Sequence, residues 1–326
     1  MKLKNILLTA GLVICALSII FILTKGRPQD KVSFDSLAQL GESIVHHADK
    51  SVLSFVEISD AEEMRIGQKM HQRIIGAGGY CQELTDPKLA AYVTAVGTQL
   101  LDNVKRADIK YTFHLIDTGC ANAFSSAGGH IYITKGLLDS LKSEAELAFI
   151  LGHEIIHVDA KHCINSIQYR LAAEKANGAV MDYCVDIGYQ TFLRPAYSEF
   201  QEDEADSGGL FLTYKAGYHP ASAVIAFEHI DDYDLNAELA VNPVDDTVKA
   251  AGGFFGRYFD THPSVIDRVV KLEKQIADAK LVGKFYLGLR NYKEKVPRSS
   301  KAYRAEFRSV IIKEKPKEIM SKDPRA

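Results

Sequence analysis

The sequence lacks the features that mark several large classes of protein. Its formal net charge is only −3, so it has no overall basic excess of the kind found in nucleic-acid-binding proteins, and we expect no nucleic-acid partner. It contains 9 prolines and 23 glycines, and 47% of its residues are hydrophobic, which excludes a collagen-like fibre and a wholly disordered chain. It has a single long apolar run, which excludes a polytopic membrane protein. A globular chain remains, long enough for one large domain or two small ones.

Cysteine is also scarce. The chain has five cysteines and no C-x-x-C pair of the kind that binds metals or carries out redox chemistry. Cys15 lies in the apolar run, and the even number that remains favours an oxidising compartment, with unrelated small core residues as the alternative. Of the possible pairs we expect Cys163 with Cys184, because a turn between them would place the two cysteines on neighbouring helices.

The apolar run covers residues 6–24, with Lys2 and Lys4 before it and Lys25 after it. A helix of this length spans about 28 Å, close to the thickness of the hydrocarbon layer of a bilayer. No A-x-A-like cleavage site follows the run. We therefore expect residues 1–24 to form an uncleaved N-terminal membrane anchor, with a cleaved signal peptide as the alternative.

Beyond the anchor, the charge and the hydrophobic pattern divide the chain into three parts. Residues 25–55 are a predicted tether, residues 56–279 a predicted folded domain, and residues 280–326 a basic C-terminal tail with 14 Lys/Arg against 5 Asp/Glu. Such a tail suits anionic lipid headgroups near the anchor, although a basic run is more often simply solvated. The tail shows no repeated unit, so no helical-repeat partner domain is expected.

The spacing of apolar residues predicts an α+β protein that is mainly helical. Helices are predicted at residues 59–75, from Asp86-Pro87 onward, from Ser143 to about Ala173, and at 178–192, 199–215, 220–230 and 264–279. Alternating apolar and polar residues predict strands at 109–115 and 130–134. A small sheet therefore comes just before the longest helix.

That helix contains His153-Glu154-Ile155-Ile156-His157. Histidines at i and i+4 lie about 40° apart around a helix, so both imidazoles reach one metal ion. Glu154 lies about 100° from His153, beside such an ion, where it would accept a proton from bound water. Gly152 precedes the motif, and because a glycine inside a helix is unfavourable, we expect that some group approaches the helix closely there.

A catalytic zinc needs a third protein ligand. His162 lies nine residues from His153, on the opposite face of a continuous helix, and is rejected. The acidic segment 199–206 is a better source, because Glu202 and Asp206 share a helical face, so that one would bind zinc while the other holds a ligand imidazole. On spacing alone, two other carboxylates of this segment also qualify, Glu199 and Asp203.

These residues carry a resemblance to a known family. HEIIH followed some 45 residues later by Glu202-x-x-x-Asp206 resembles the gluzincin pattern of the M-forty-eight metallopeptidases, which include HtpX-like membrane proteases, BepA-like periplasmic proteases and CAAX prenyl proteases. Three further segments are similar, and with them the resemblance covers about residues 56–275. They are Glu63 to Gly67, Asn122-Ala123-Phe124 before Gly128-Gly129, and Thr261-His262-Pro263 with Arg268.

The resemblance implies a zincin-like metalloprotease domain, with a small edge-stranded β-sheet and the HExxH motif on an active-site helix. It implies one Zn²⁺ per chain, with His153, His157 and Glu202 as ligands, Glu154 as general base and Asp206 bonded to a ligand histidine. The activity implied is proteolysis of misfolded or unassembled envelope proteins. A zinc-stabilised chaperone or assembly factor without turnover is one alternative, and an anchored binding module without zinc is another.

The resemblance also implies where substrate and protein lie. Asn122, Ala123 and Phe124, with Gly128 and Gly129, correspond to the edge strand along which an extended peptide substrate would bind by β-augmentation. The family setting places the anchor in a bacterial inner membrane and the catalytic domain in the periplasm, or free in the periplasm if the signal is cleaved.

His262 precedes Pro263, which biases it towards an extended backbone in a loop, where histidines are by default surface or packing residues. The resemblance places it at the rim of the active site. There it would either donate to the oxyanion of the tetrahedral intermediate, with Arg268 nearby, or occupy the open position of the zinc and block it. We expect the blocking role.

Overall fold

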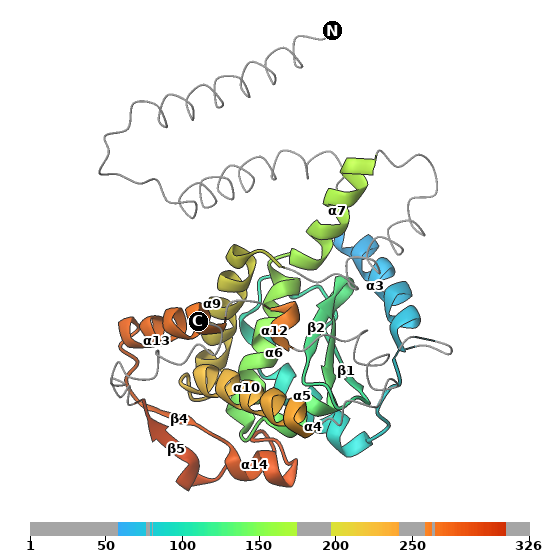
Figure 1. Cartoon of the computed structure of the whole chain (residues 1–326). Coiled ribbons are helices and arrows are strands. Elements are labelled where there is room, and N and C mark those ends of the chain that lie inside the picture. Colours follow the sequence, from blue (N-terminus) through green and yellow to red (C-terminus); the bar gives the residue numbers. More distant parts are fainter. Residues whose placement is uncertain are drawn as a thin grey trace, which may run out of the picture. The chain divides into compact units, whose positions relative to one another are not determined.

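The computed structural model (Figure 1) describes most of the compact unit formed by residues 56–326. The described residues are 58–75, 79, 81–174, 197–240, 258–262 and 265–310. The predicted anchor and tether, the helix predicted at 178–192, and Cys184 lie outside them. Within the described ranges, no helix combines the length and the apolar character needed to cross a membrane.

A three-stranded sheet flanks one side of the domain. It consists of β1 (Thr112–Ile116), β2 (Ala123–Ser126) and β3 (His130–Thr134), in the order β1-β3-β2. β1 runs parallel to β3, and β2 runs antiparallel to it, so β2 is an edge strand. The prediction of a strand at 130–134 is confirmed, and β1 begins three residues later than predicted.

The turn from β2 to β3 is η2 (Ala127–Gly129), in which Gly128 has φ +79°, a left-handed conformation that favours glycine. The N–H of Gly128 donates to the buried carboxylate of Glu63 at 3.2 Å. Glu63 belongs to α3 (Asp60–Ile75), so this bond attaches α3 to the end of the sheet.

Short-range signals in the sequence placed most helix ends correctly. α4 (Pro87–Thr98) begins at its proline, with the Asp86 side chain accepting a hydrogen bond from Leu89 N at 3.0 Å. α9 (Glu199–Lys215), α10 (Ser222–Ala240) and α13 (Val265–Asp278) also occur where helices were predicted, and α10 is longer than expected. Three short helices complete this part of the chain: η1 (Leu101–Asn103), α5 (Lys135–Ser140) and α12 (Tyr258–Thr261).

The prediction of one helix from Ser143 to Ala173 was wrong. The segment forms two helices, α6 (Glu144–Asp159) and α7 (His162–Glu174), separated by Lys161 in the left-handed region with φ +66°. The end of α6 is bound from outside: Asp159 accepts hydrogen bonds from the backbone N–H groups of Lys105 and Arg106, and the Arg106 guanidinium donates to Val158 O. These long-range bonds stop the helix where its own sequence would continue it.

α6 lies between the sheet on one side and α9 and α10 on the other (Figure 1). It meets α9 at two glycines. A Cβ on Gly152 would lie 3.0 Å from Gly209 O, and one on Gly209 would lie 2.7 Å from His153 N. The two backbones therefore approach as closely as glycine alone permits, which is the close contact that Gly152 indicated. This contact brings the acidic face of α9 against the HEIIH motif.

The predicted basic tail is folded over most of its described length. β4 (Lys284–Tyr286) pairs with β5 (Phe307–Ser309), and α14 (Leu289–Glu294) and η3 (Arg304–Glu306) lie between them. Tyr286 and Tyr292 are buried in the same core as α6. The boundary expected at residue 280 is therefore not an end of the fold, because aromatic side chains beyond it complete the core.

Cys163 lies at the start of α7 with a buried, free thiol, and Cys184, its expected partner, lies outside the described residues. The Sγ of Cys163 is 3.3 Å from the Tyr197 hydroxyl and donates to Ser125 Oγ at 3.6 Å. The break at Lys161 turns Cys163 towards β2, which carries Ser125. The described part of the chain is mainly helical with small sheets, as predicted.

Candidate metal centre

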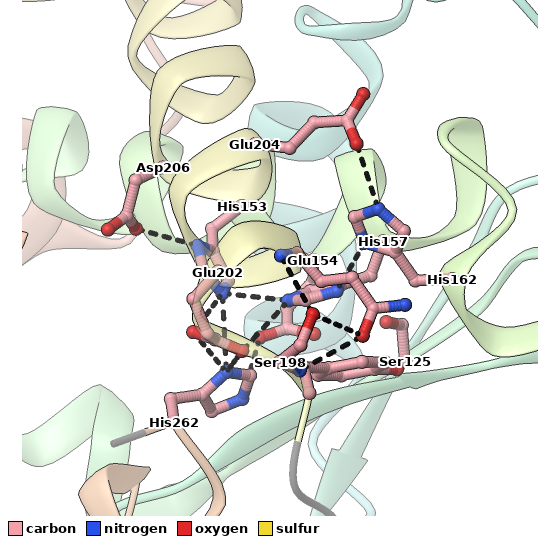
Figure 2. Close-up of polar contacts among 12 residues, drawn as sticks. Ser125, His153, Glu154, His157, His162, Ser198, Glu202, Glu204, Asp206 and His262 are labelled. Carbon is pink, nitrogen blue, oxygen red and sulfur yellow. Dashed lines mark hydrogen bonds and ion pairs between the residues drawn. The ribbon is translucent and has the colours of Figure 1, made fainter. Parts of the chain in front are cut away.

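Four side chains converge beside the meeting point of α6 and α9 (Figure 2). His153 and His157 come from α6, Glu202 from α9, and His262 from the residue that follows α12. One ligand atom from each lies within 4.8 Å of the others, and none of the four is more than 1% exposed. The first three are the ligands expected from the sequence, and His262 adds a fourth donor.

His153 is oriented by Asp206, as the i+4 spacing from Glu202 suggested. The Nδ1 of His153 lies 2.9 Å from Asp206 Oδ1. A carboxylate accepts only, so Nδ1 carries the proton and Nε2 presents its lone pair to the cluster. Burial raises the pKa of Asp206, but the Arg268 guanidinium and His153 outweigh it and lower that pKa to about 2.

His157 is oriented by a relay that the sequence analysis missed. Its Nδ1 lies 2.9 Å from His162 Nδ1, and His162 Nε2 lies 3.2 Å from Glu204 Oε2. Glu204 accepts from Nε2 of His162, which leaves Nδ1 of His162 to accept from His157 and the Nε2 of His157 free to face the cluster. His162 is therefore not a ligand, but it lies beside the motif because α6 ends before it. Burial and the neighbouring histidines hold the pKa of His157 well below its usual range.

Tyr197, just before α9, also escaped the sequence analysis. Its ring stacks on His157 with centroids 3.8 Å apart and planes 18° apart. Burial raises the pKa of its hydroxyl well above the usual value, so the ring is neutral. A lone tyrosine in a loop carries no sequence signal for such a position.

The choice among the carboxylates of α9 is clear in the structure. Glu202 Oε2 lies 3.6 Å from His153 Nε2, and its Oε1 lies 3.6 Å from His157 Nε2. Glu199 and Asp203 face solvent and bind Lys271 instead. Spacing alone could not choose among these three carboxylates. The structure chooses Glu202, because its side of α9 faces α6.

Arg268 is buried, and its charge balances the acidic side of the cluster. Its guanidinium forms two 2.7 Å hydrogen bonds to the carboxylate of Asp206 and lies 3.0 Å from Glu202 Oε2. It also donates to His262 O at 3.1 Å. Burial raises the pKa of Glu202, but His262, His153 and Arg268 together lower it, so both carboxylates are ionised. All these bonds hold carboxylates and a backbone carbonyl in place, and none points Arg268 at a substrate.

Glu154 lies on α6 next to the ligands and is fully buried. Among the described residues, neither of its carboxylate oxygens has a hydrogen-bond partner. The nearby ring nitrogen is His262 Nε2, 3.6 Å from Oε1. A buried carboxylate without a hydrogen bond is unfavourable unless another group binds it, so this side chain is placed for a ligand or water.

His262 Nδ1 lies 3.0 and 3.1 Å from the two oxygens of Glu202 and 3.3 Å from His153 Nε2. Its ring stacks on Tyr258, whose backbone N–H donates to Ala121 O at 2.9 Å. Burial lowers the pKa of His262, but Glu202 and Glu154 outweigh it and raise that pKa above the usual value. The α12 segment therefore reaches from Ala121, two residues before β2, into the cluster.

The residues present fit a zinc ion. His153 Nε2 and His157 Nε2 are 3.0 Å apart, and the orienting contacts leave both with a lone pair and no proton to share. A cation bound by both nitrogens would stabilise this arrangement. Two imidazoles, one carboxylate and a neighbouring acid are a donor set found at catalytic zinc sites.

The predicted edge residues line one flank of α6. Asn122 is tied to β3, since its backbone N–H donates to Thr134 Oγ1 and its carbonyl accepts from Thr134 N. Ala123 and Phe124 open β2, while Gly128 and Gly129 form the turn at its far end. All five are buried by the described chain.

Comparison with known proteins agrees with this site. The sequence profile described as Peptidase family M48 matches residues 87–276, which include every residue of the cluster. The mitochondrial metalloendopeptidase OMA1 of Schizosaccharomyces pombe is 25% identical over 240 residues, covering 70% of this chain and 65% of that protein.

Two other relatives match over shorter stretches. OMA1 of Arabidopsis thaliana is 31% identical over 160 residues, covering 48% of this chain and 30% of that protein. The beta-barrel assembly-enhancing protease of Escherichia coli is 23% identical over 193 residues, covering 54% of this chain and 39% of that protein. The chain thus spans less than two thirds of the length of these curated relatives.

Proposed function

Because this chain belongs to Peptidase family M48, we propose that it is a zinc-dependent endopeptidase. His153, His157 and Glu202 would hold the zinc, and Glu154 would be the general base. The observation that carries the proposal is the fully buried Glu154 carboxylate, which has no hydrogen-bond partner in the described chain and lies beside three oriented zinc donors. A metal site with only a structural role needs no such acid.

Different residues of the chain would have different roles in hydrolysis. Bound zinc would supply positive charge that lowers the pKa of a water molecule to about 7. Glu154 accepts the proton of the attacking water and passes it to the leaving amine. Asp206 and the Glu204–His162 pair keep both ligand histidines in one tautomer, and Arg268 compensates the buried acids.

We propose misfolded or unassembled envelope proteins as the substrates, bound extended along β2. Support comes from the order of the sheet, which leaves β2 at an edge next to α6, because an edge strand pairs with a peptide backbone of any sequence. The name of the beta-barrel assembly-enhancing relative points to substrates of this class. The proposal includes anchoring by residues 6–24 in a bacterial inner membrane, a periplasmic catalytic domain, and contact of the basic C-terminal residues with anionic lipid headgroups.

We propose that His262 blocks the open position of the zinc until α12 moves. Its Nδ1 lies among the other ligand atoms and would bind zinc on losing the proton that it donates to Glu202. The same segment hydrogen-bonds Ala121, two residues before β2. The contacts of Arg268 with Asp206, Glu202 and a carbonyl favour this reading over a shared oxyanion role. Movement of α12 would free both the metal and the edge of β2.

The test is Glu154→Gln, which keeps the size of the side chain and removes the base. We expect casein cleavage to fall by about 10²–10⁴-fold while zinc content, measured by mass spectrometry, stays the same. The matched control is Glu199→Gln, which makes the same change on an exposed carboxylate and should leave both quantities unchanged.

Casein cleavage retained by zinc-loaded Glu154→Gln would remove Glu154 as the base. A wild-type protein that binds zinc and shows no chelator-sensitive cleavage would favour the chaperone alternative instead. A wild-type protein that binds no zinc would favour a binding module.

A further inference from the structure

A second cluster of histidines takes no part in the proposed hydrolysis. His71 comes from α3, His114 from β1, and His130 is the first residue of β3. One ring nitrogen of each lies within 4.8 Å of the other two. We infer that these three histidines form a second metal site, which takes a zinc-class divalent cation and ties α3 to the sheet.

The contacts within the cluster leave lone pairs without protons. His114 Nε2 lies 3.0 Å from His130 Nδ1, and Thr112 Oγ1 lies 3.1 and 3.0 Å from the same two nitrogens. A neutral imidazole nitrogen holds either one proton or one lone pair. The three contacts therefore cannot all be two-centre hydrogen bonds, and a cation between the nitrogens resolves the conflict.

The rings are in the neutral form that binds metal. Burial lowers the pKa of His114 to about 3 and that of His130 to about 4, and it also lowers the pKa of His71. His71 Nδ1 lies 3.2 Å from the Tyr132 hydroxyl, a contact that fixes this ring and leaves its other nitrogen available. His71 and His114 are only partly buried, so an ion has a way in from solvent.

An all-imidazole set selects the metal by chemistry. Imidazole suits Zn²⁺, Cu²⁺ and Ni²⁺, whereas Ca²⁺ and Mg²⁺ require oxygen ligands. The rings of His71 and His130 are stacked, with planes 10° apart, whereas those of His153 and His157 are 74° apart. Side chains must therefore rotate to coordinate an ion here, and this site is expected to bind zinc more weakly than the first.

The position of the site gives the ion a structural role. α3 is attached to the sheet where Glu63 binds Gly128, at the turn between β2 and β3. A cation on His71, His114 and His130 would add a second attachment, on β1 and β3. β3 is the strand that pairs with the edge strand β2. The ion would therefore also stabilise the strand to which β2 is hydrogen-bonded.

The experiment counts zinc per chain in the full-length protein. The background is Glu154→Gln, which prevents self-cleavage and keeps every proposed ligand. Protein stripped with a chelator is dialysed against buffered Zn²⁺, and zinc is measured by mass spectrometry. We expect two zinc ions per chain in this background, one after adding His114→Gln, one after adding His157→Ala, and none after adding both.

His229→Gln is the matched control, because His229 is a partly buried histidine paired with Glu146 outside both clusters, and it should retain two ions. His71→Asn, on the partly exposed face of α3, repeats the test if His114→Gln does not fold by circular dichroism. One zinc per chain in the background, or a second zinc that survives both His114→Gln and His71→Asn, overturns the proposal. That result leaves the first centre and the proposed peptidase activity intact, since these are measured by His157→Ala and casein cleavage.

Discussion

The two histidine clusters of this protein differ in the groups that surround their imidazoles. At the first, Glu202, Asp206 and Glu154 lie against the histidines, and the carboxylates outweigh burial to raise the pKa of His262. At the second, the histidines contact one another and the hydroxyls of Thr112 and Tyr132, and burial lowers the pKa of each histidine.

The difference matches the roles that we propose, catalysis at the first cluster and metal binding alone at the second. A catalytic centre needs a base and fixed ligand tautomers, and α6 and α9 supply both. The second cluster has nitrogens that fit an ion but, among the described residues, no buried acid in contact with it. Under these proposals the same ligand type would serve two purposes, and the neighbouring groups would decide which.

The largest expected effect tests the buried charges of the first cluster. Arg268→Met should reduce the free energy of unfolding of the metal-free protein by about 3–5 kcal/mol, because it leaves Asp206 and Glu202 buried without their cation. Urea denaturation measures this. Lys271→Met, which breaks exposed ion pairs of the neighbouring helix, should cost about 1 kcal/mol or less. Equal losses of unfolding free energy in the two variants would show that the buried ion pairs of Arg268 stabilise the fold no more than the exposed pairs of Lys271.

A second test changes the close contact between α6 and α9, on which the first cluster depends and the second does not. Gly209→Ala would place a methyl group 2.7 Å from His153 N, so α9 must move away from α6. We expect a loss of about 1–3 kcal/mol in stability and weaker zinc binding at the first centre, with the second unchanged. Gly119→Ala, where a Cβ meets nothing within 4 Å, is the control. Unaltered zinc affinity in Gly209→Ala would mean that the metal centre does not depend on the close contact between α6 and α9.

The first cluster has one donor more than a catalytic zinc requires, and His262→Ala tests the extra one. If about nine-tenths of the molecules are in the blocked form, turnover of unfolded casein at saturating zinc should rise about tenfold in His262→Ala. The second cluster has no equivalent residue to remove. A fall of about 100-fold would instead assign His262 to the oxyanion, and no change would make it a packing residue.

The smallest expected effect concerns the second cluster. Thr112→Val keeps the shape of the side chain and removes the hydroxyl that contacts both His114 and His130. In metal-free protein we expect a loss of about 1 kcal/mol in stability. In zinc-saturated protein the loss should shrink, because the ion then satisfies both nitrogens. Thermal unfolding with and without zinc measures the difference, and identical losses in the two conditions would contradict an ion at this place.

Local patterns determined much of what the sequence predicted. The capping residues before α3, α4, α6 and α9 involve partners three residues apart, so backbone geometry alone sets them. The same holds for His153 and His157, which share a helix face in any fold that keeps α6 helical. The proposed base and two of the proposed metal donors therefore come from five consecutive residues.

Tertiary structure decided what no short pattern contains. The rotation of α9 about its axis, set by the contact of Gly152 with Gly209, selected Glu202 over Glu199 and Asp203. The end of α6, bound by Arg106 from a distant loop, placed His162 beside His157 rather than behind it. His71, His114 and His130 meet only because α3 packs on the sheet. Spacing along one helix is fixed by covalent geometry, whereas the meeting of remote elements depends on packing, which the sequence encodes only through the whole chain.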